Sequence, residues 1–179
     1  MYHISEDIRA QKSAKRICDA LIACAKYKPF DEITVADLHK EHLISRTTFY
    51  RLFDNTVDVL EFCCDQMGRS ILLNIRGTTP KELTINAITA LRERRELIEL
   101  LSRSGHLDIF QKVGEKYIPL SILTKELNLE FGSEYFYRIL SQIIPTAIDV
   151  WVKGGQKDSP EDVYEKLYKS IKTLGQIFE

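Results

Sequence analysis

Apolar residues recur every three or four positions along almost the whole chain, which is the period of an amphipathic helix and not of a strand. In residues 5–28 these positions fall near one face of a helix, while basic residues occupy other faces. Only 8 of the 179 residues are glycine and 5 are proline, which disfavours an all-β fold because such folds need many turns. The pattern therefore predicts an all-α protein of about eight or nine helices.

Capping residues and helix breakers set the expected helix boundaries. Pro29 stops the first helix, and Thr34 with Asp37 has a spacing close to that of a capping box at the start of the second. Pro119 and Pro145 are expected to kink or interrupt two of the later helices. The predicted helices span residues 5–28, 35–41, 46–52, 56–77, 80–103, 107–129, 133–153 and 160–178.

The chain has no overall positive charge that could attract nucleic acid. The chain has 25 basic and 26 acidic residues and a formal charge of −1, so any nucleic-acid site must be a local basic patch. No segment resembles a signal peptide or could span a bilayer, and we expect a soluble, cytoplasmic protein with no membrane partner. Four cysteines are expected to be reduced thiols packed in the core: Cys18, Cys24, Cys63 and Cys64.

Residues 33–53 carry the pattern that points to a function. Two short helices joined by a tight connector are typical of a helix-turn-helix. The second opens with small polar and basic residues, as a recognition helix needs because it enters the major groove by its N-terminus. Phe49 and Phe53, four positions apart, are expected to point inward and anchor this helix. The predicted DNA contacts are Thr34, Ser45, Arg46, Thr47, Thr48, Tyr50 and Arg51, with Lys12 and Arg16 from a basic cluster on the first helix.

The same stretch resembles the TetR family of transcriptional regulators. The resemblance is carried by Thr34-Val35, Leu38, Ile44-Ser45, Thr47-Thr48-Phe49-Tyr50, Phe53 and Leu60. Residues 151–155 and 159–161 are also similar to the junction before that family's last helix. The resemblance implies a dimeric repressor. Its head, residues 1–54, would bind a palindromic double-stranded DNA operator, and its body, residues 55–179, would bind an effector and the partner subunit.

The chain departs from the family pattern at two positions. Leu43 stands in the connector where the family usually has glycine, so either the connector bends in another way or Leu43 adopts a strained conformation. Thr56 stands at the start of the fourth helix where the family usually has lysine. This change removes one charged phosphate contact and leaves a hydroxyl and the helix N-terminus in its place.

The body is expected to bind a small apolar effector in gaps left by the two prolines, among helices 56–77, 80–103, 107–129 and 133–153. The candidate lining residues are Cys64, Met67, Tyr117 and Phe136, although each is also a plausible core residue. The last two helices carry wide apolar faces, which favours a homodimer with a four-helix interface. An alternative is that one helix buries its face internally. The residues on these faces are Ile144, Ile148, Trp151, Val152, Val163, Leu167, Ile171, Leu174 and Phe178.

Several alternatives remain open from the sequence. Residues 33–53 are compatible with an ordinary helical hairpin, and the basic residues of the first helix with a solvated face. An enzyme is not favoured, because the chain has no glycine-rich phosphate loop and no H-E-x-x-H or G-x-S-x-G motif. No cofactor or metal is expected, since His39 and His42 lack a third ligand at suitable spacing. The main rival is a TetR-like adaptor or co-activator that acts through protein partners without ligand control.

Overall fold

The computed structural model describes residues 2–118 and 134–177, and within these ranges the regular secondary structure is helical apart from one isolated β-bridge. This finding confirms the all-α prediction. The elements are α1 (Ile8–Cys24), η1 (Phe30–Glu32), α2 (Val35–His42), α3 (Arg46–Leu52), α4 (Thr56–Asn74), α5 (Pro80–Arg92), α6 (Arg95–Arg103), α7 (Leu107–Tyr117), α9 (Glu134–Lys153) and α10 (Pro160–Ile177).

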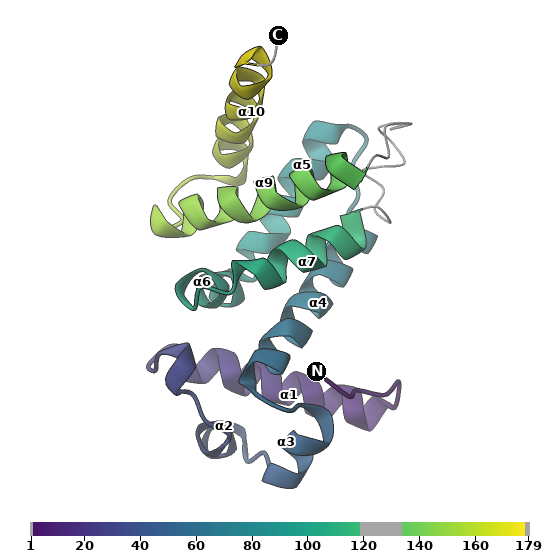
Figure 1. Ribbon diagram of the computed structural model, residues 1–179, viewed down its shortest axis with the longest axis vertical. Coiled ribbons are helices and arrows are strands. Elements are labelled where there is room, and N and C mark those ends of the chain that lie inside the picture. Colours follow the sequence, from purple (N-terminus) through teal and green to yellow (C-terminus); the bar gives the residue numbers. More distant parts are fainter. Residues whose placement is uncertain (1, 119–133, 178–179) are drawn as a thin grey trace.

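The helices form a head and a body that share α4 (Figure 1). Helices α1, α2 and α3 lie together at one end of the molecule, and α10 lies at the other. Helix α4 contacts α1 in the head and α5, α6 and α7 in the body, while α9 packs on α6 and α7. Because one continuous helix belongs to both parts, the position of the head is tied to the packing of the body.

The caps that start the head helices follow from short polar side chains. Asp7 accepts hydrogen bonds from the backbone N–H groups of Arg9 and Ala10 at the start of α1. Thr34 and Asp37 form a complete capping box at the start of α2, as predicted. These contacts satisfy N–H groups that have no partner within the helix, and they fix where each helix begins.

The segment predicted as one helix over residues 80–103 is two helices, α5 and α6, with a turn at Glu93 and Arg94. A single straight helix would place Leu91 and Leu100 on opposite faces, since nine residues at 100° each give half a turn beyond two full turns. Both side chains are buried, and the turn permits this by rotating α6 relative to α5. Pro145 lies inside α9, whereas the predicted break at Pro119 lies outside the described residues.

Two glycines lie where body helices cross. A Cβ atom built on Gly68 of α4 would overlap Cγ1 of Val113 on α7. A Cβ on Gly114 would lie 3.4 Å from the Cβ of Ser141 on α9. The α4–α7 crossing therefore depends on a residue without a side chain, whereas at the α7–α9 crossing an added Cβ would make an ordinary van der Waals contact.

The apolar faces of the last two helices are only partly used within the subunit. Ile148 and Trp151 of α9, both predicted to face a partner, are buried inside the body. Ile171 and Leu174 of α10 are exposed, and residues 168–177 are exposed at every position. No helix in the described ranges is long and apolar enough to cross a membrane.

Candidate nucleic-acid interface

The first turn of α3 presents hydrogen-bonding side chains to solvent. Ser45 is the N-cap, and its hydroxyl accepts from the backbone N–H of Thr48 at 3.1 Å and lies 2.8 Å from the Thr48 hydroxyl. Arg46, Thr47 and Tyr50 are exposed, and Tyr50 retains 58% of its accessible surface. Solvent can therefore be replaced by a ligand at this turn without any change in the packing of the head.

The opposite side of α3 is held by buried aromatic rings. Phe49 and Phe53 have no exposed surface, and their ring centroids are 6.0 Å apart. Phe53 also contacts Phe62 of α4 with centroids 5.8 Å apart. Both predicted anchors thus point inward, although Phe53 is extended and follows the helix rather than lying in it.

A segment that the sequence pattern did not reveal supports the end of α3. Tyr2 forms an isolated antiparallel bridge with Phe53, and its ring meets Phe62 edge-on at 5.4 Å. The backbone N–H of His3 donates to the carbonyl of Leu52 at 2.8 Å. A single bridge leaves no period-2 pattern in the sequence, so the only available signal was an aromatic residue at position 2.

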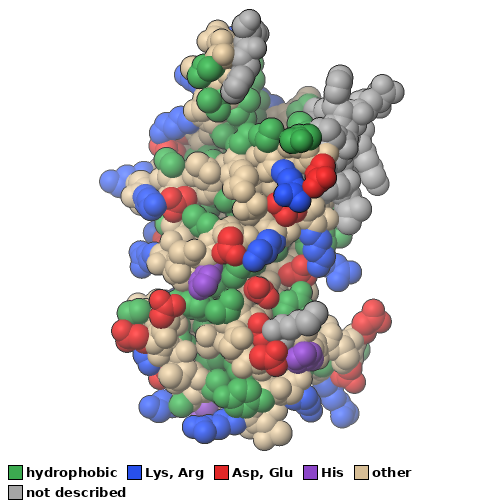
Figure 2. All heavy atoms as spheres, viewed as in Figure 1, with side chains coloured by type: hydrophobic (Ala, Val, Ile, Leu, Met, Phe, Trp, Pro, Cys, Tyr) green, Lys and Arg blue, Asp and Glu red, His purple; other side chains and the backbone are tan. Residues whose placement is uncertain are grey.

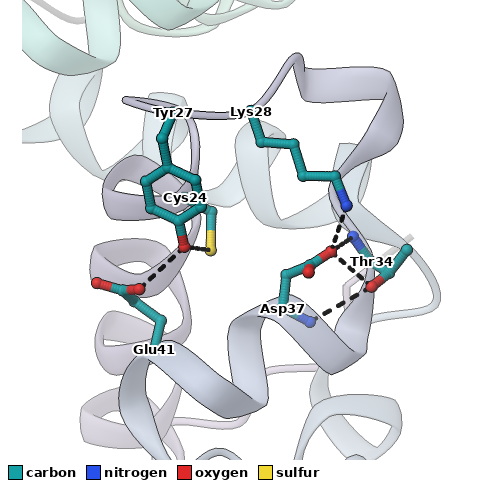
Figure 3. A network of polar contacts seen from close by, with 6 residues as sticks. All are labelled: Cys24, Tyr27, Lys28, Thr34, Asp37 and Glu41. Carbon is teal, nitrogen blue, oxygen red and sulfur yellow. Dashed lines mark hydrogen bonds and ion pairs between the residues drawn. The ribbon is translucent and has the colours of Figure 1, made fainter.

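Thr34, predicted to contact DNA, is engaged within the head (Figure 3). Its hydroxyl donates to a carboxylate oxygen of Asp37 at 2.6 Å, and Lys28 reaches the same oxygen at 2.8 Å. These hydrogen bonds hold the pKa of Asp37 well below its usual range, and the one from Lys28 has the largest effect. A carboxyl with a lowered pKa stabilises the fold at neutral pH and loses this contribution only as the pH falls below its unfolded pKa.

A second polar contact fastens α2 to the end of α1 (Figure 3). The Tyr27 hydroxyl lies 3.0 Å from a carboxylate oxygen of Glu41 and 3.3 Å from the Cys24 sulfur. The hydrogen bonds with Cys24 and with Glu41 raise the pKa of Tyr27. Together with the Asp37 cluster, this contact fixes α2 at both of its ends, and α2 in turn supports α3.

Five basic residues of α1 and α3 that bear on the DNA prediction lie in three different settings. Arg46 and Arg51 on α3 are exposed and have no acidic partner among the described residues, and Figure 2 shows Lys and Arg side chains gathered at the end of the molecule formed by the head. Lys12 and Lys15 line a groove of about 900 Å³ between α1 and the body helices. Arg16 donates through Nη2 to the backbone carbonyl of His42 at 2.8 Å. Of the predicted cations, Arg46 and Arg51 alone lie on α3.

The predicted effector-lining residues lie in or near the body core. Cys64, Met67 and Tyr117 are buried and Phe136 is half-buried. The Tyr117 hydroxyl donates to Asp65 at 3.0 Å, and burial raises the pKa of Cys64.

A small apolar cavity of about 50 Å³ lies where α4, α5, α7 and α9 meet, within the predicted set of helices. Gly68, Val113, Gly114 and Pro145 are among its lining residues, whereas the four predicted ones are not. Their role in binding an effector stays a prediction. Among the described residues there is also no cluster of three or more His, Cys, Asp or Glu side chains that could hold a metal ion.

Solved structures of other proteins share this arrangement of helices. Lin0861 from Listeria innocua aligns with a TM-score of 0.79 and 18% identity over 96% of both chains. A TetR transcriptional regulator from Streptococcus agalactiae aligns with a TM-score of 0.66 and 19% identity over 90% of this chain and 94% of the other. The chain has a TetR-like fold.

The dihydroxyacetone kinase operon activator DhaS shares the TetR-like fold, with a TM-score of 0.63 and 17% identity over 93% of this chain and 98% of that one. No family model and no curated protein matches the sequence. The TetR-like fold is therefore recognised here through structure, in agreement with the short motif in residues 33–53.

Proposed function

We propose that the chain is a dimeric TetR-like transcriptional regulator that binds a palindromic operator through α3. The observation that carries the proposal is the two-sided character of α3. Phe49 is fully buried beneath it, while Arg46, Thr47 and Tyr50 project into solvent from the other side. A recognition helix needs this arrangement, because its base-reading side chains must reach the major groove while its own position stays fixed.

The proposed dimer forms through α9 and α10. A groove of about 600 Å³ runs between them and is lined by apolar side chains, among them Ile139, Val150, Ile171 and Leu174. Large apolar side chains left exposed along both helices favour a partner, and a second copy supplies the same surface by two-fold symmetry. Two heads then read two half-sites, which compensates for the few base-reading residues in each.

Light scattering at micromolar concentration is expected to give twice the chain mass of 20.7 kDa. Introducing charge with Leu174→Glu should shift the mass to that of a monomer, because an unpaired carboxylate would be buried in the interface. Leu43→Glu, at a position 80% exposed in the head, serves as the control and should leave the mass unchanged. A monomeric wild-type chain would remove the dimer from the proposal.

An effector would regulate such a protein by binding more tightly to one spacing of the two heads than to another. The cavity of about 50 Å³ beside Gly68 and Gly114 is far smaller than the roughly 300 Å³ at which pockets for drug-sized ligands begin. An effector of that size would have to push α4 and α7 apart on entering, which would couple binding to the head. A thermal-shift screen with small apolar compounds that finds no stabilising ligand would count against an effector site in the body.

The second candidate is an activator or adaptor that works through protein partners without ligand control. Two observations favour it: the small size of the body cavity, and the structural similarity to DhaS, which is described as an operon activator. A reporter gene placed behind the bound DNA separates an activator from a repressor, which is the form of the first candidate that the family resemblance implies. Deleting the regulator raises expression if it represses and lowers expression if it activates.

Replacing Arg46 and Tyr50 with alanine is expected to abolish specific binding to the DNA flanking the protein's own gene. A well-placed side-chain contact to a base contributes about 1–3 kcal/mol, so two losses weaken the affinity by about one and a half to four orders of magnitude. A gel shift at constant salt measures the effect. Wild-type binding should also weaken steeply with added salt, because phosphate contacts release counterions.

Arg92→Ala is the matched control for this experiment. Arg92 is an exposed body arginine on α5 with no partner among the described residues, so its loss removes the same charge without touching α3. Specific binding should survive Arg92→Ala and disappear in the double variant. Retention of specific binding by Arg46→Ala/Tyr50→Ala would refute the assignment of α3 as the recognition helix.

A further inference from the structure

The turn between α2 and α3 has an unusual backbone for its sequence. Leu43 has φ 53° and ψ 39°, in the left-handed region that favours glycine because a Cβ crowds the backbone there. Its side chain is 80% exposed, so its own packing contributes little to hold this conformation. Something outside Leu43 must keep the turn closed.

Arg16 supplies the first restraint. It lies on α1, and its guanidinium Nη2 donates to the backbone carbonyl of His42 at 2.8 Å. His42 is the last residue of α2, so its carbonyl has no partner within the helix. A cation at this end is also favoured by the helix dipole. The contact joins the first helix of the head directly to the residue before Leu43.

His39 of α2 supplies the second restraint, which acts on the carbonyl that follows Leu43. Its Nδ1 lies 2.8 Å from the carbonyl oxygen of Ile44 and must donate, because a carbonyl only accepts. The two backbone carbonyls that flank Leu43 are thus each bound by a side chain from another position. The backbone N–H of Leu43 itself donates to the His39 carbonyl at 2.8 Å.

We propose that Arg16 and His39 are positioning residues that hold the left-handed turn at Leu43 and thereby aim the recognition helix. This inference rests on the proposed function for its effect on DNA, but its structural part stands without DNA. Helix α3 begins two residues after Ile44, so a turn that leaves the left-handed region redirects Arg46 and its neighbours. Arg16 then acts on DNA through the turn and not as a phosphate contact.

The structural part is tested by amide hydrogen exchange on the purified full chain. Arg16→Ala and His39→Ala should each lower protection at Leu43 and Phe49, whose N–H groups close the turn and the start of α3. Adding Leu43→Gly to either variant should restore protection at Phe49, because glycine adopts the left-handed conformation without restraint. Lys15→Ala, which removes the neighbouring exposed cation, should change neither amide.

Unchanged protection in Arg16→Ala and His39→Ala would overturn the proposal, as would loss of protection that Leu43→Gly fails to restore. Uniform loss of protection over the whole head, with no recovery, would also overturn it, since a general fold defect is not specific to the turn. Because these measurements use no DNA, they decide the structural part even if the wild-type chain binds no duplex.

The DNA part uses the duplex that the wild-type chain selects most strongly from a randomised library. If Arg16→Ala lowers the population of the left-handed turn to a tenth, binding to this duplex should weaken about tenfold. The slope of log K against log salt concentration should not change. Adding Leu43→Gly should return the affinity to that of Leu43→Gly alone. A direct phosphate contact predicts the opposite: a slope lower by about 0.9 and no rescue by glycine. That result would overturn the assignment of Arg16.

Discussion

Replacing Phe49 with alanine is expected to lower the free energy of unfolding by about 3–5 kcal/mol, the range for truncating a fully buried aromatic ring. Phe49 has no exposed surface, and its ring contacts those of Phe53 and Tyr50 at centroid distances of 6.0 and 5.3 Å. Urea denaturation followed by circular dichroism measures the loss.

Tyr50→Ala is the matched control, because Tyr50 is the next residue of the same helix and also aromatic. It is 58% exposed, so we expect its removal to change the stability by less than about 1 kcal/mol. The two variants should also differ in the property that they lose. Tyr50→Ala should fold normally but bind DNA poorly, whereas Phe49→Ala should lose stability. Equal destabilisation by both substitutions would mean that α3 does not have one buried and one exposed side.

Replacing Gly68 with alanine is expected to destabilise the chain by about 1–3 kcal/mol, the usual consequence of overpacking. On a free helix surface the same change stabilises by up to about 1 kcal/mol, because alanine has the higher helix propensity. The reversal follows from Val113, whose Cγ1 occupies the space that the new Cβ needs. Valine in a helix has one strongly preferred rotamer, so the methyl group cannot simply rotate away.

Gly175→Ala provides the control for Gly68→Ala. Gly175 lies in α10, and a Cβ added there would meet no atom of the described residues of its own subunit within 4 Å, so alanine should stabilise the isolated subunit slightly. Val113→Ala should relieve the overlap, so that Gly68→Ala costs less in that background than in the wild type; thermal unfolding of the four combinations gives the coupling. Additive effects of the two substitutions would contradict the close crossing of α4 and α7.

The features that the sequence predicted well are those that arise locally. The capping box at Thr34 and the inward Phe49 each depend on residues within one helical turn of one another, and periodicity and capping rules describe such contacts directly. The all-α fold followed for the same reason. The left-handed Leu43 was one of two outcomes anticipated where the family usually has glycine.

The features that the sequence did not predict depend on contacts between distant segments. The break between α5 and α6 has no glycine or proline to mark it, and it exists because Leu91 and Leu100 both need burial in the body. The bridge between Tyr2 and Phe53 joins segments about fifty residues apart. The hydrogen bond from Arg16 to the carbonyl of His42 joins α1 to the end of α2, and the spacing of the basic residues on α1 gave no indication of it.

The close crossing at Gly68 has a geometric consequence for the head. Gly68 lies twelve residues beyond Thr56 along α4, which corresponds to about 18 Å of helix at 1.5 Å per residue. If α4 turns about this crossing as a rigid rod, a tilt of about 6° displaces its far end by about 2 Å over that length. A small rotation of α4 within the body would therefore displace the end of α4 that follows α3 by about 2 Å.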